Sequence, residues 1–158
     1  MALITEKADR LERLERLEHD LRLATTPAPS LFSRVLADAC TRIPALRTAG
    51  KAAHIDRLVA AGAWTDAAYA LIALELPAWQ VRRLWREESA WFCSLSQRPA
   101  WPVALDDTAD AAHEELPLAV LLAFLQARRL SALAVGARSP IPHMQHAADG
   151  TVCCDNFA

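Results

Sequence analysis

The sequence of 158 residues lacks a long apolar run, and it lacks an apolar segment of the secretory type at its start. Charges appear already at Glu6 and Lys7, which is too early for the apolar core of a signal peptide. The longest strongly apolar run, Leu116 to Leu125, is far shorter than the ~20 residues that span a bilayer. We therefore expect a cytoplasmic protein that does not enter a membrane and keeps its four cysteines reduced.

An excess of positive charge is also missing. The net charge is −2, and lysine is scarce. The densest basic cluster, Arg82, Arg83 and Arg86, is followed directly by Glu87 and Glu88, which largely cancel it. Because binding to nucleic acid requires a positive field against the phosphates, we expect no nucleic-acid partner.

The remaining composition is that of an ordinary globular protein, with 53% hydrophobic and 23% charged residues. A chain of this length corresponds to about one domain, by the usual ~100–200 residues per domain, and is long enough to build a core. No catalytic or cofactor motif stands out. The absence of such a motif favours a non-catalytic protein.

Residues 5–24 form the clearest helical pattern. Leucines recur at spacings of three and four, which places them on one stripe of a helix, among alternating Glu and Arg residues. They are Leu11, Leu14, Leu17 and Leu21. The stripe favours a short coiled coil within an extended helical segment 1–26, used for self-association or for docking a partner. The alternative is that the stripe packs on the protein's own core.

A globular helical domain is expected over residues 30–132. Helical patterns cover about 31–41, 51–61 and 65–75. Pro44, Gly62 and Pro77 end them, because proline cannot continue a helix and glycine adopts the left-handed cap cheaply. The segment 116–130 is apolar nearly all round, which is typical of a central buried helix. Pro117 either kinks this helix or occupies its first turn.

Between these helices the apolar residues alternate, which predicts a β-hairpin over residues 79–96 with strands 79–86 and 91–96. Its odd-numbered residues are expected to share the buried face, with Trp85 opposite Trp91 and a turn within 87–90. The predicted fold class is therefore mainly α with a small antiparallel hairpin, in which a helical bundle packs on two strands.

The five tryptophans of the chain gather around this hairpin. Exposed aromatic side chains close to arginine are typical of binding surfaces. Trp85 and Trp91 are therefore candidate interaction residues. The alternative is that most of the tryptophans cover the helices, because one face of a small sheet must be buried.

Four side chains near the C-terminus could bind a metal: His143, His146, Cys153 and Cys154. Imidazoles and thiolates are good zinc ligands, but adjacent cysteines are an awkward pair and the spacing matches no common zinc module. We expect residues 136–158 to form a flexible tail. The alternative to a metal site is that this tail contains the four residues by chance.

A second group of titratable residues surrounds His113. Its members are Asp106, Asp107, Asp110, Glu114 and Glu115, and a smaller pair is His54 with Asp56. We expect residues after Asp107 to begin an alanine-rich helix, which would place Asp110 and His113 on one face. The group could then hold a metal or serve acid–base chemistry, although an acidic first helical turn is the simpler interpretation. Cys93, in a half-buried strand, is expected to belong to the core.

Three segments, 70–77, 91–96 and 112–119, resemble a group of short uncharacterised proteins from rhizobia and related alphaproteobacteria. The resemblance covers about residues 65–130. It implies a bacterial, intracellular setting and no particular chemistry.

The sequence therefore predicts a non-catalytic interaction or accessory protein that self-associates and binds a protein partner. The alternative is a metal-binding protein or metal-dependent enzyme, which uses either the tail or the acidic group around His113.

Overall fold

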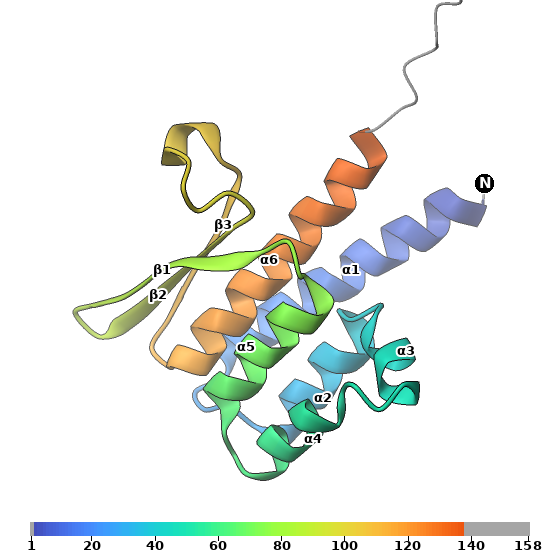
Figure 1. The fold of residues 1–158 in the computed structure, drawn as a ribbon, viewed down its shortest axis with the longest axis horizontal. Coiled ribbons are helices and arrows are strands. Elements are labelled where there is room, and N and C mark those ends of the chain that lie inside the picture. The colour runs from blue at the N-terminus through green and yellow to red at the C-terminus, as the bar shows by residue number, and fades with distance from the viewer. Residues whose placement is uncertain (1, 138–158) are drawn as a thin grey trace, which may run out of the picture.

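The computed structural model describes residues 2–137, which form six helices and one three-stranded antiparallel sheet (Figure 1). The elements follow one another as α1 (Ala2–Leu23), α2 (Pro29–Asp38), α3 (Ile43–Thr48), α4 (Ala53–Ala60), α5 (Trp64–Glu75), β1 (Gln80–Glu87), β2 (Ala90–Ser96), β3 (Thr108–His113) and α6 (Leu116–Ala137). A short 3₁₀ turn, Val103–Leu105, interrupts the loop before β3. The predicted mixture of helices with an antiparallel hairpin is confirmed, but the sheet has a third strand.

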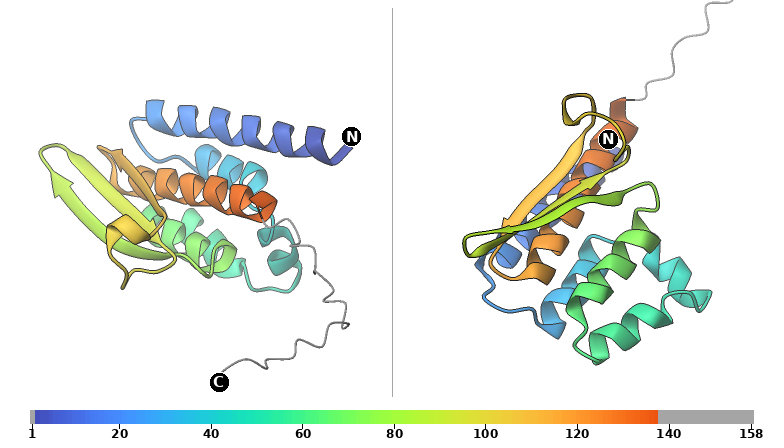
Figure 2. Two further views of the ribbon diagram at one scale, coloured as in Figure 1. Left: turned by 90° about the horizontal axis from the view of Figure 1, so that it is seen from above. Right: turned by 60° about the vertical axis from the view of Figure 1, so that its left-hand side comes forward.

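Helix α6 lies at the centre of the fold (Figures 1 and 2). It packs against α1, α5, β2 and β3. The residues from Leu118 to Leu125 are all at most 2% exposed, which confirms the predicted central helix. Pro117 lies in the first turn, where its missing N–H costs little.

By length and composition alone, Leu116–Ala134 would also suit a membrane span. The uninterrupted apolar run within this segment, 116–125, is shorter than a membrane span, so the sequence analysis did not predict a span. More than half of this segment is buried inside the protein. The core helix of a globular fold has the same properties, so the segment is only weak evidence for a membrane location.

Helix α1 packs along α6 and α2. Its inward side chains Leu14, Leu17 and Leu21 are 2%, 0% and 0% exposed and belong to the same hydrophobic core as α5 and α6. Two ion pairs join α1 to α6 near the surface. Arg129 Nη2 of α6 lies 2.8 Å from Glu15 Oε1, and Arg129 Nη1 lies 2.6 Å from Glu18 Oε2. The expected helical segment 1–26 and the expected globular domain 30–132 therefore share one hydrophobic core.

The helices α2, α4 and α5 confirm the predicted segments to within a few residues, and Gly62 (φ +70°) ends the α4 segment as expected. Helix α3 was missed, because Pro44 was interpreted as a stop. In the structure Pro44 lies at the start of α3, since a proline in a first helical turn has no N–H to leave unpaired.

Strand β3 is the main correction to the predicted fold. Residues 108–113 pair antiparallel with β2 instead of beginning a helix. Alanine favours helices by a fraction of a kcal/mol per residue, and the pairing with β2 overrides this preference. The small side chains of Ala109 and Ala111 face α6, so the helix can pack closely on the sheet.

A β-bulge at Arg82 changes the faces of the predicted hairpin. Val81 pairs with Leu95, but Arg83 pairs with Ser94, so Arg82 is an extra residue in β1. After a bulge of this kind the alternation of faces shifts by one residue. Odd-numbered residues of β2 do face the core, whereas in β1 it is Leu84 that faces inward. The turn is the two-residue Glu88–Ser89, which lies within the predicted range 87–90.

Candidate functional site

The outer face of the sheet, turned away from α6, carries a pair of partly exposed aromatic side chains. Trp85 and Phe92 stand opposite each other on β1 and β2, and Phe92 is paired with Ala112 of β3. Their rings are stacked, with centroids 5.0 Å apart and an interplanar angle of 12°. Both side chains remain partly exposed. Stacking in this position requires Trp85 to face outward. The two-residue turn brings this about, because it pairs Glu87 with Ala90 and therefore Trp85 with Phe92.

The loop formed by residues 97–107 folds against one end of this face and is fixed there by Arg82. The guanidinium donates from Nη1 to Asp106 Oδ2 at 3.0 Å and from Nη2 to the Trp101 carbonyl oxygen at 2.7 Å. Ser96 Oγ donates to the same Asp106 oxygen and accepts from the Arg98 backbone N–H at 2.9 Å. The Asp106 side chain is only 3% exposed. Arg82, the bulge residue, therefore holds the loop in place against the sheet.

This anchored loop presents apolar side chains to solvent. Trp101, Val103 and Leu105 are 48%, 60% and 67% exposed. A hollow of about 100 Å³ lies between the loop and the sheet, and it is lined by Trp85 and Val103 among others. Trp85, Phe92, Trp101, Val103 and Leu105 are hereafter called the aromatic surface.

Arginines accompany the tryptophans of the sheet and loop. The guanidinium carbon of Arg98 lies 4.4 Å from the ring centroid of Trp101, and that of Arg83 lies 5.6 Å from Trp85. Such cation–π contacts hold both partners in defined positions at modest energy, about 0.5–1 kcal/mol when exposed. Tryptophan and arginine are also the residues most enriched in binding hot spots. This surface therefore combines the residue types that are typical of binding hot spots.

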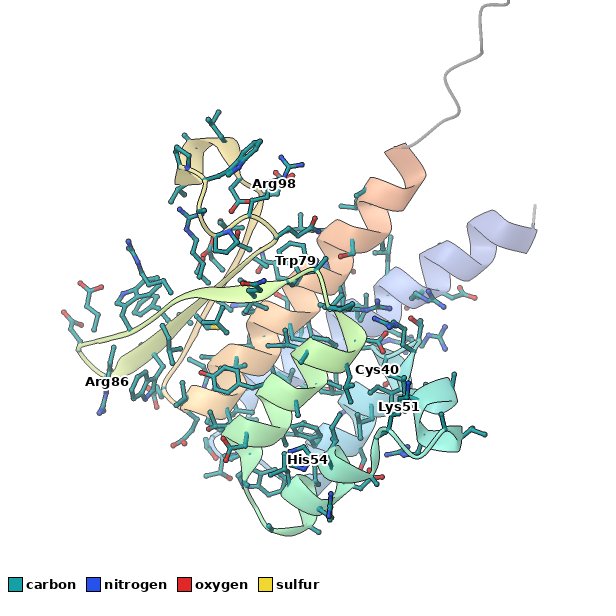
Figure 3. All side chains as sticks on the ribbon, viewed as in Figure 1. Cys40, Lys51, His54, Trp79, Arg86 and Arg98 are labelled. Atoms are coloured by element: carbon teal, nitrogen blue, oxygen red, sulfur yellow. The ribbon has the colours of Figure 1, made fainter. Side chains whose placement is uncertain are left out.

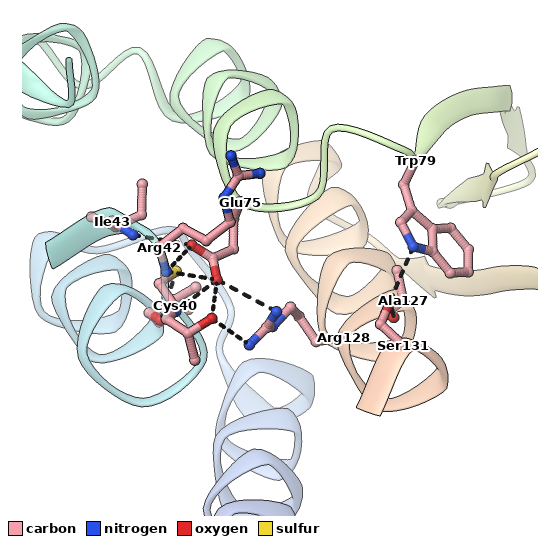
Figure 4. Close-up of polar contacts among 10 residues, drawn as sticks. Cys40, Arg42, Ile43, Glu75, Trp79, Ala127, Arg128 and Ser131 are labelled. Atoms are coloured by element: carbon pink, nitrogen blue, oxygen red, sulfur yellow. Dashed lines mark hydrogen bonds and ion pairs between the residues drawn. The ribbon is translucent and has the colours of Figure 1, made fainter. Parts of the chain in front are cut away.

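Trp85 and Trp91, the two tryptophans predicted to be interaction residues, lie on different faces of the sheet. Trp85 belongs to the aromatic surface, whereas Trp91 is paired with Arg86 and packs partly against the core. Trp79 is 4% exposed, and its Nε1 donates to Ser131 Oγ of α6 at 3.1 Å (Figure 4). The pairing of Trp85 with Trp91 is therefore wrong, because the two-residue turn pairs Glu87 with Ala90 and so places Trp85 opposite Phe92. Trp101, the most exposed of the five tryptophans, was not singled out by its sequence context.

The leucine stripe, the other predicted interaction site, is occupied within the fold. Leu14, Leu17 and Leu21 are buried between α1, α2 and α6, and Leu11 is partly exposed. This is the alternative interpretation of the stripe, in which it packs on the protein's own core. These leucines are not available to another molecule while α1 is in place.

The residues around His113 do not converge. Asp110 is paired with Ser94 on the outer face, and its Oδ2 accepts from Thr108 Oγ1 at 2.6 Å. His113 is paired with Trp91 on the opposite face, and its Nδ1 accepts from the Glu115 N–H at 3.0 Å. The predicted common face was wrong because this segment is a strand, in which residues three apart point to opposite sides.

Other titratable groups of the predicted sites are engaged elsewhere or lie outside the described residues. Asp56, expected beside His54, lies 2.6 Å from Arg47 Nη2. Within residues 2–137 no three His, Cys, Asp or Glu side chains lie close enough together to hold a metal ion. The proposed zinc ligands fall outside this range, so their role stays a prediction: His143, His146, Cys153 and Cys154.

A buried carboxylate that the sequence analysis missed joins three segments of the helical part (Figure 4). Glu75 is 0% exposed and accepts from the backbone N–H groups of Thr41 at 2.6 Å, Arg42 at 2.9 Å and Ile43 at 3.2 Å. Arg128 Nη1 of α6 lies 3.4 Å from it. A single acid in the apolar run of α5 was the signal that could have revealed it, because a buried charge requires partners.

The same region contains Cys40, whose Sγ donates to the Val35 carbonyl oxygen at 3.5 Å (Figures 3 and 4). Burial, followed by the charge of Glu75, raises the pKa of this thiol to about 12. Burial likewise raises the pKa of Cys93 to about 12, with Asp110 adding to the effect. Because the thiolate is the nucleophile, both cysteines are inert at neutral pH. Cys40 therefore supplies no nucleophile to the cluster around Glu75, whose contacts join three segments of the fold. Cys93 belongs to the core, as predicted.

Comparison of the chain with protein-family models, with curated proteins and with solved structures gives no match.

Proposed function

We propose that this protein is a non-catalytic binding protein that holds a protein partner on its aromatic surface. One observation carries the proposal. Trp101, Val103 and Leu105 are 48–67% exposed on a loop that Arg82 and Asp106 fix in place. Apolar side chains held rigidly in solvent lose little conformational entropy on binding, which favours affinity.

The arrangement also fits the anatomy of interfaces. Aromatic side chains form the centre, while Arg83 and Arg98 provide polar contacts near its border. The chemistry of the described residues points the same way. Both buried cysteines are held protonated, and the Glu75 carboxylate is fully used by backbone donors. Self-association through the leucine stripe is no longer part of the proposal, because the stripe is buried.

The test is quantitative capture of partners from the native host by three immobilised proteins. These are the wild type, the surface variant Trp101→Ser/Val103→Ser, and the control Leu133→Ser. Leu133 is 55% exposed on α6 and does not belong to the aromatic surface, so the control removes similar apolar area elsewhere.

We expect at least one protein to be captured by the wild type and the control but not by the surface variant. Loss of a central tryptophan from an interface typically costs 2 kcal/mol or more, or about a thirtyfold loss of affinity. Equal capture by all three proteins would contradict the proposal.

A further inference from the structure

Strand β1 forms the edge of the sheet, with β2 along one side of it (Figures 1 and 2). No segment among residues 2–137 pairs with its other side. In an antiparallel hairpin with a two-residue turn, the pair next to the turn exchanges hydrogen bonds, and so does every second pair after it. Counting back from Glu87, the backbone groups of Leu84 and Arg86 therefore face the open edge, where another strand can pair with them.

The open edge carries exposed charges of both signs. Charged side chains and β-bulges are the usual devices that keep edge strands apart. The bulge of β1 lies at Arg82, near the start of the strand, and the pairing of residues 83–87 with β2 is regular. Within this regular segment, Arg83 and Glu87 are exposed on the outer face, and neither forms an ion pair with any described side chain. Both charges are available to a second strand.

The order of these charges is self-complementary. When a second copy of β1 runs antiparallel with Trp85 opposite Trp85, Arg83 of each copy stands opposite Glu87 of the other. A two-fold axis relates the copies, so this pair of opposite charges occurs twice. Opposite charges on directly facing residues stabilise paired strands. The edge therefore fits a second copy of itself.

The backbone hydrogen bonding agrees with this register. Around Trp85, Leu84 of one copy stands opposite Arg86 of the other, and these are the two residues whose backbone groups face the open edge. Each Leu84–Arg86 pair can therefore exchange two hydrogen bonds. Trp85 and its copy form a pair without hydrogen bonds, in which the Cα atoms approach to about 4.5 Å and the side chains are closest. Facing aromatic side chains also stabilise paired strands.

Other registers of two β1 strands bring like charges together. Facing residues share one face of the sheet, so the centre of the pairing lies at a residue and not between two. Within residues 82–87, a centre at any charged residue places that residue opposite its own copy, and a centre at Leu84 places Arg86 opposite Arg82. Like charges on facing residues are destabilising, which leaves the register centred on Trp85.

We propose that two copies of this chain associate through antiparallel β1 strands centred on Trp85 and form one continuous sheet. Arg83 and Glu87 fix the register, while Leu84 and Arg86 provide the backbone hydrogen bonds. A contact confined to one short strand is smaller than the ~1,200–2,000 Å² of stable complexes, so the dimer dissociates on dilution. The inference goes beyond the proposed function, because it assigns a second interaction site whose occupant is the chain itself.

The test is sedimentation velocity of the full chain over a wide range of concentrations. The variants are Arg83→Glu, Glu87→Arg and the charge-swapped Arg83→Glu/Glu87→Arg. The control is Arg57→Glu, which reverses an exposed arginine on α4, outside the sheet.

We expect the wild type and the control to dimerise equally, and each single variant to dimerise at least about tenfold more weakly, because it places like charges opposite each other twice. The charge-swapped variant restores the opposite pairs and should restore the dimer. An equimolar mixture of the two single variants should also dimerise, because one chain then carries two acids where the other carries two arginines. Misfolding cannot produce such mutual rescue.

Three results would overturn the proposal: a wild type that stays monomeric at the highest concentration, a dimer that both single variants leave intact, or single variants that do not rescue each other. The proposed function is tested separately, by partner capture. Trp101→Ser/Val103→Ser should lose the partner and remain dimeric. A dimer lost in this variant would place self-association on the aromatic surface instead of β1, and would also overturn the proposal.

Discussion

The two faces of the sheet are built from the same strands but differ in what covers them. The inner face carries small side chains such as Cys93, Ala109 and Ala111, which let α6 pack closely. The outer face carries Trp85 and Phe92, and among the described residues the loop 97–107 folds against it. These two bulky aromatic side chains therefore lie on the face that does not pack on α6, where they remain partly exposed. If the proposed function is right, the inner face maintains stability and the outer face serves recognition.

The largest effect is expected on the far side of α6, where α1 covers the core. Leu17→Asp should lower the free energy of unfolding by about 4–5 kcal/mol or more, because it places a charge without a partner at a fully buried position. The matched control Leu11→Asp, at a partly exposed position of the same stripe, should cost far less. Chemical denaturation measures both. If both variants stay stable and only a dimer is lost, the stripe serves self-association after all.

On the inner face of the sheet, Leu95→Ala should lower the free energy of unfolding by about 2–5 kcal/mol. Leu95 is 0% exposed, so its truncation leaves a cavity beneath α6. Urea denaturation followed by circular dichroism provides the measurement. A loss below 0.5 kcal/mol, typical of surface positions, would remove the distinction between the two faces.

At the border between the faces, Arg82→Ala should cost about 2–3 kcal/mol, because it leaves the buried Asp106 carboxylate without its cation. Hydrogen exchange should accelerate in residues 97–107 more than in β2. The control Arg83→Ala, which removes an exposed arginine from the neighbouring position, should leave this loop protected. Equal exchange in both variants would mean that Arg82 does not hold the loop.

The buried thiol of Cys93 should make stability depend on alkaline pH. Its pKa is about 12 in the folded protein against an ordinary value of 9.0, so the unfolded state loses its proton first as the pH rises. Stability is therefore retained below pH 9 and falls between pH 9 and 12, by about 1.4 kcal/mol per pH unit for one thiol. Cys93→Ala should show a correspondingly shallower decline in urea denaturation at several pH values. An unchanged slope would contradict burial of this thiol.

On the outer face, Trp101→Ser/Val103→Ser should change the free energy of unfolding by no more than about 0.5 kcal/mol, since both side chains are largely exposed. Thermal denaturation of the variant and of Leu133→Ser should coincide. A large destabilisation would show that the loop 97–107 belongs to the core, and would weaken the assignment of recognition to this face.

Much of the helical architecture could be predicted from periodicity. The leucine spacing of α1 and the apolar run of α6 indicated helices that the structure contains. Strand β3 could not be predicted in the same way, because its alanines favour a helix and only the pairing with β2 makes it a strand. Whether a leucine stripe meets its own core or another molecule also depends on tertiary packing, which spacing does not encode.

The candidate site was predicted in place but not in detail. Tryptophans near the hairpin drew attention to the sheet, but the two-residue turn decides that Trp85 stands beside Phe92 on the outer face and not beside Trp91. A difference of one residue in the length of a turn moves every side chain to the other face and leaves little trace in an alternating pattern. The exposed loop residues Trp101 and Val103 lie in a proline-containing segment without periodicity, so no pattern could mark them.

The central position of α6 has a consequence for synthesis of the protein. It follows every other described element along the chain, yet α1, α5, β2 and β3 all pack on it. A ribosome therefore completes all its neighbours before their common partner emerges. Until then the leucines of α1 and the inner face of the sheet remain uncovered, and nascent chains of this protein should be substrates for chaperones until the last helix has left the exit tunnel.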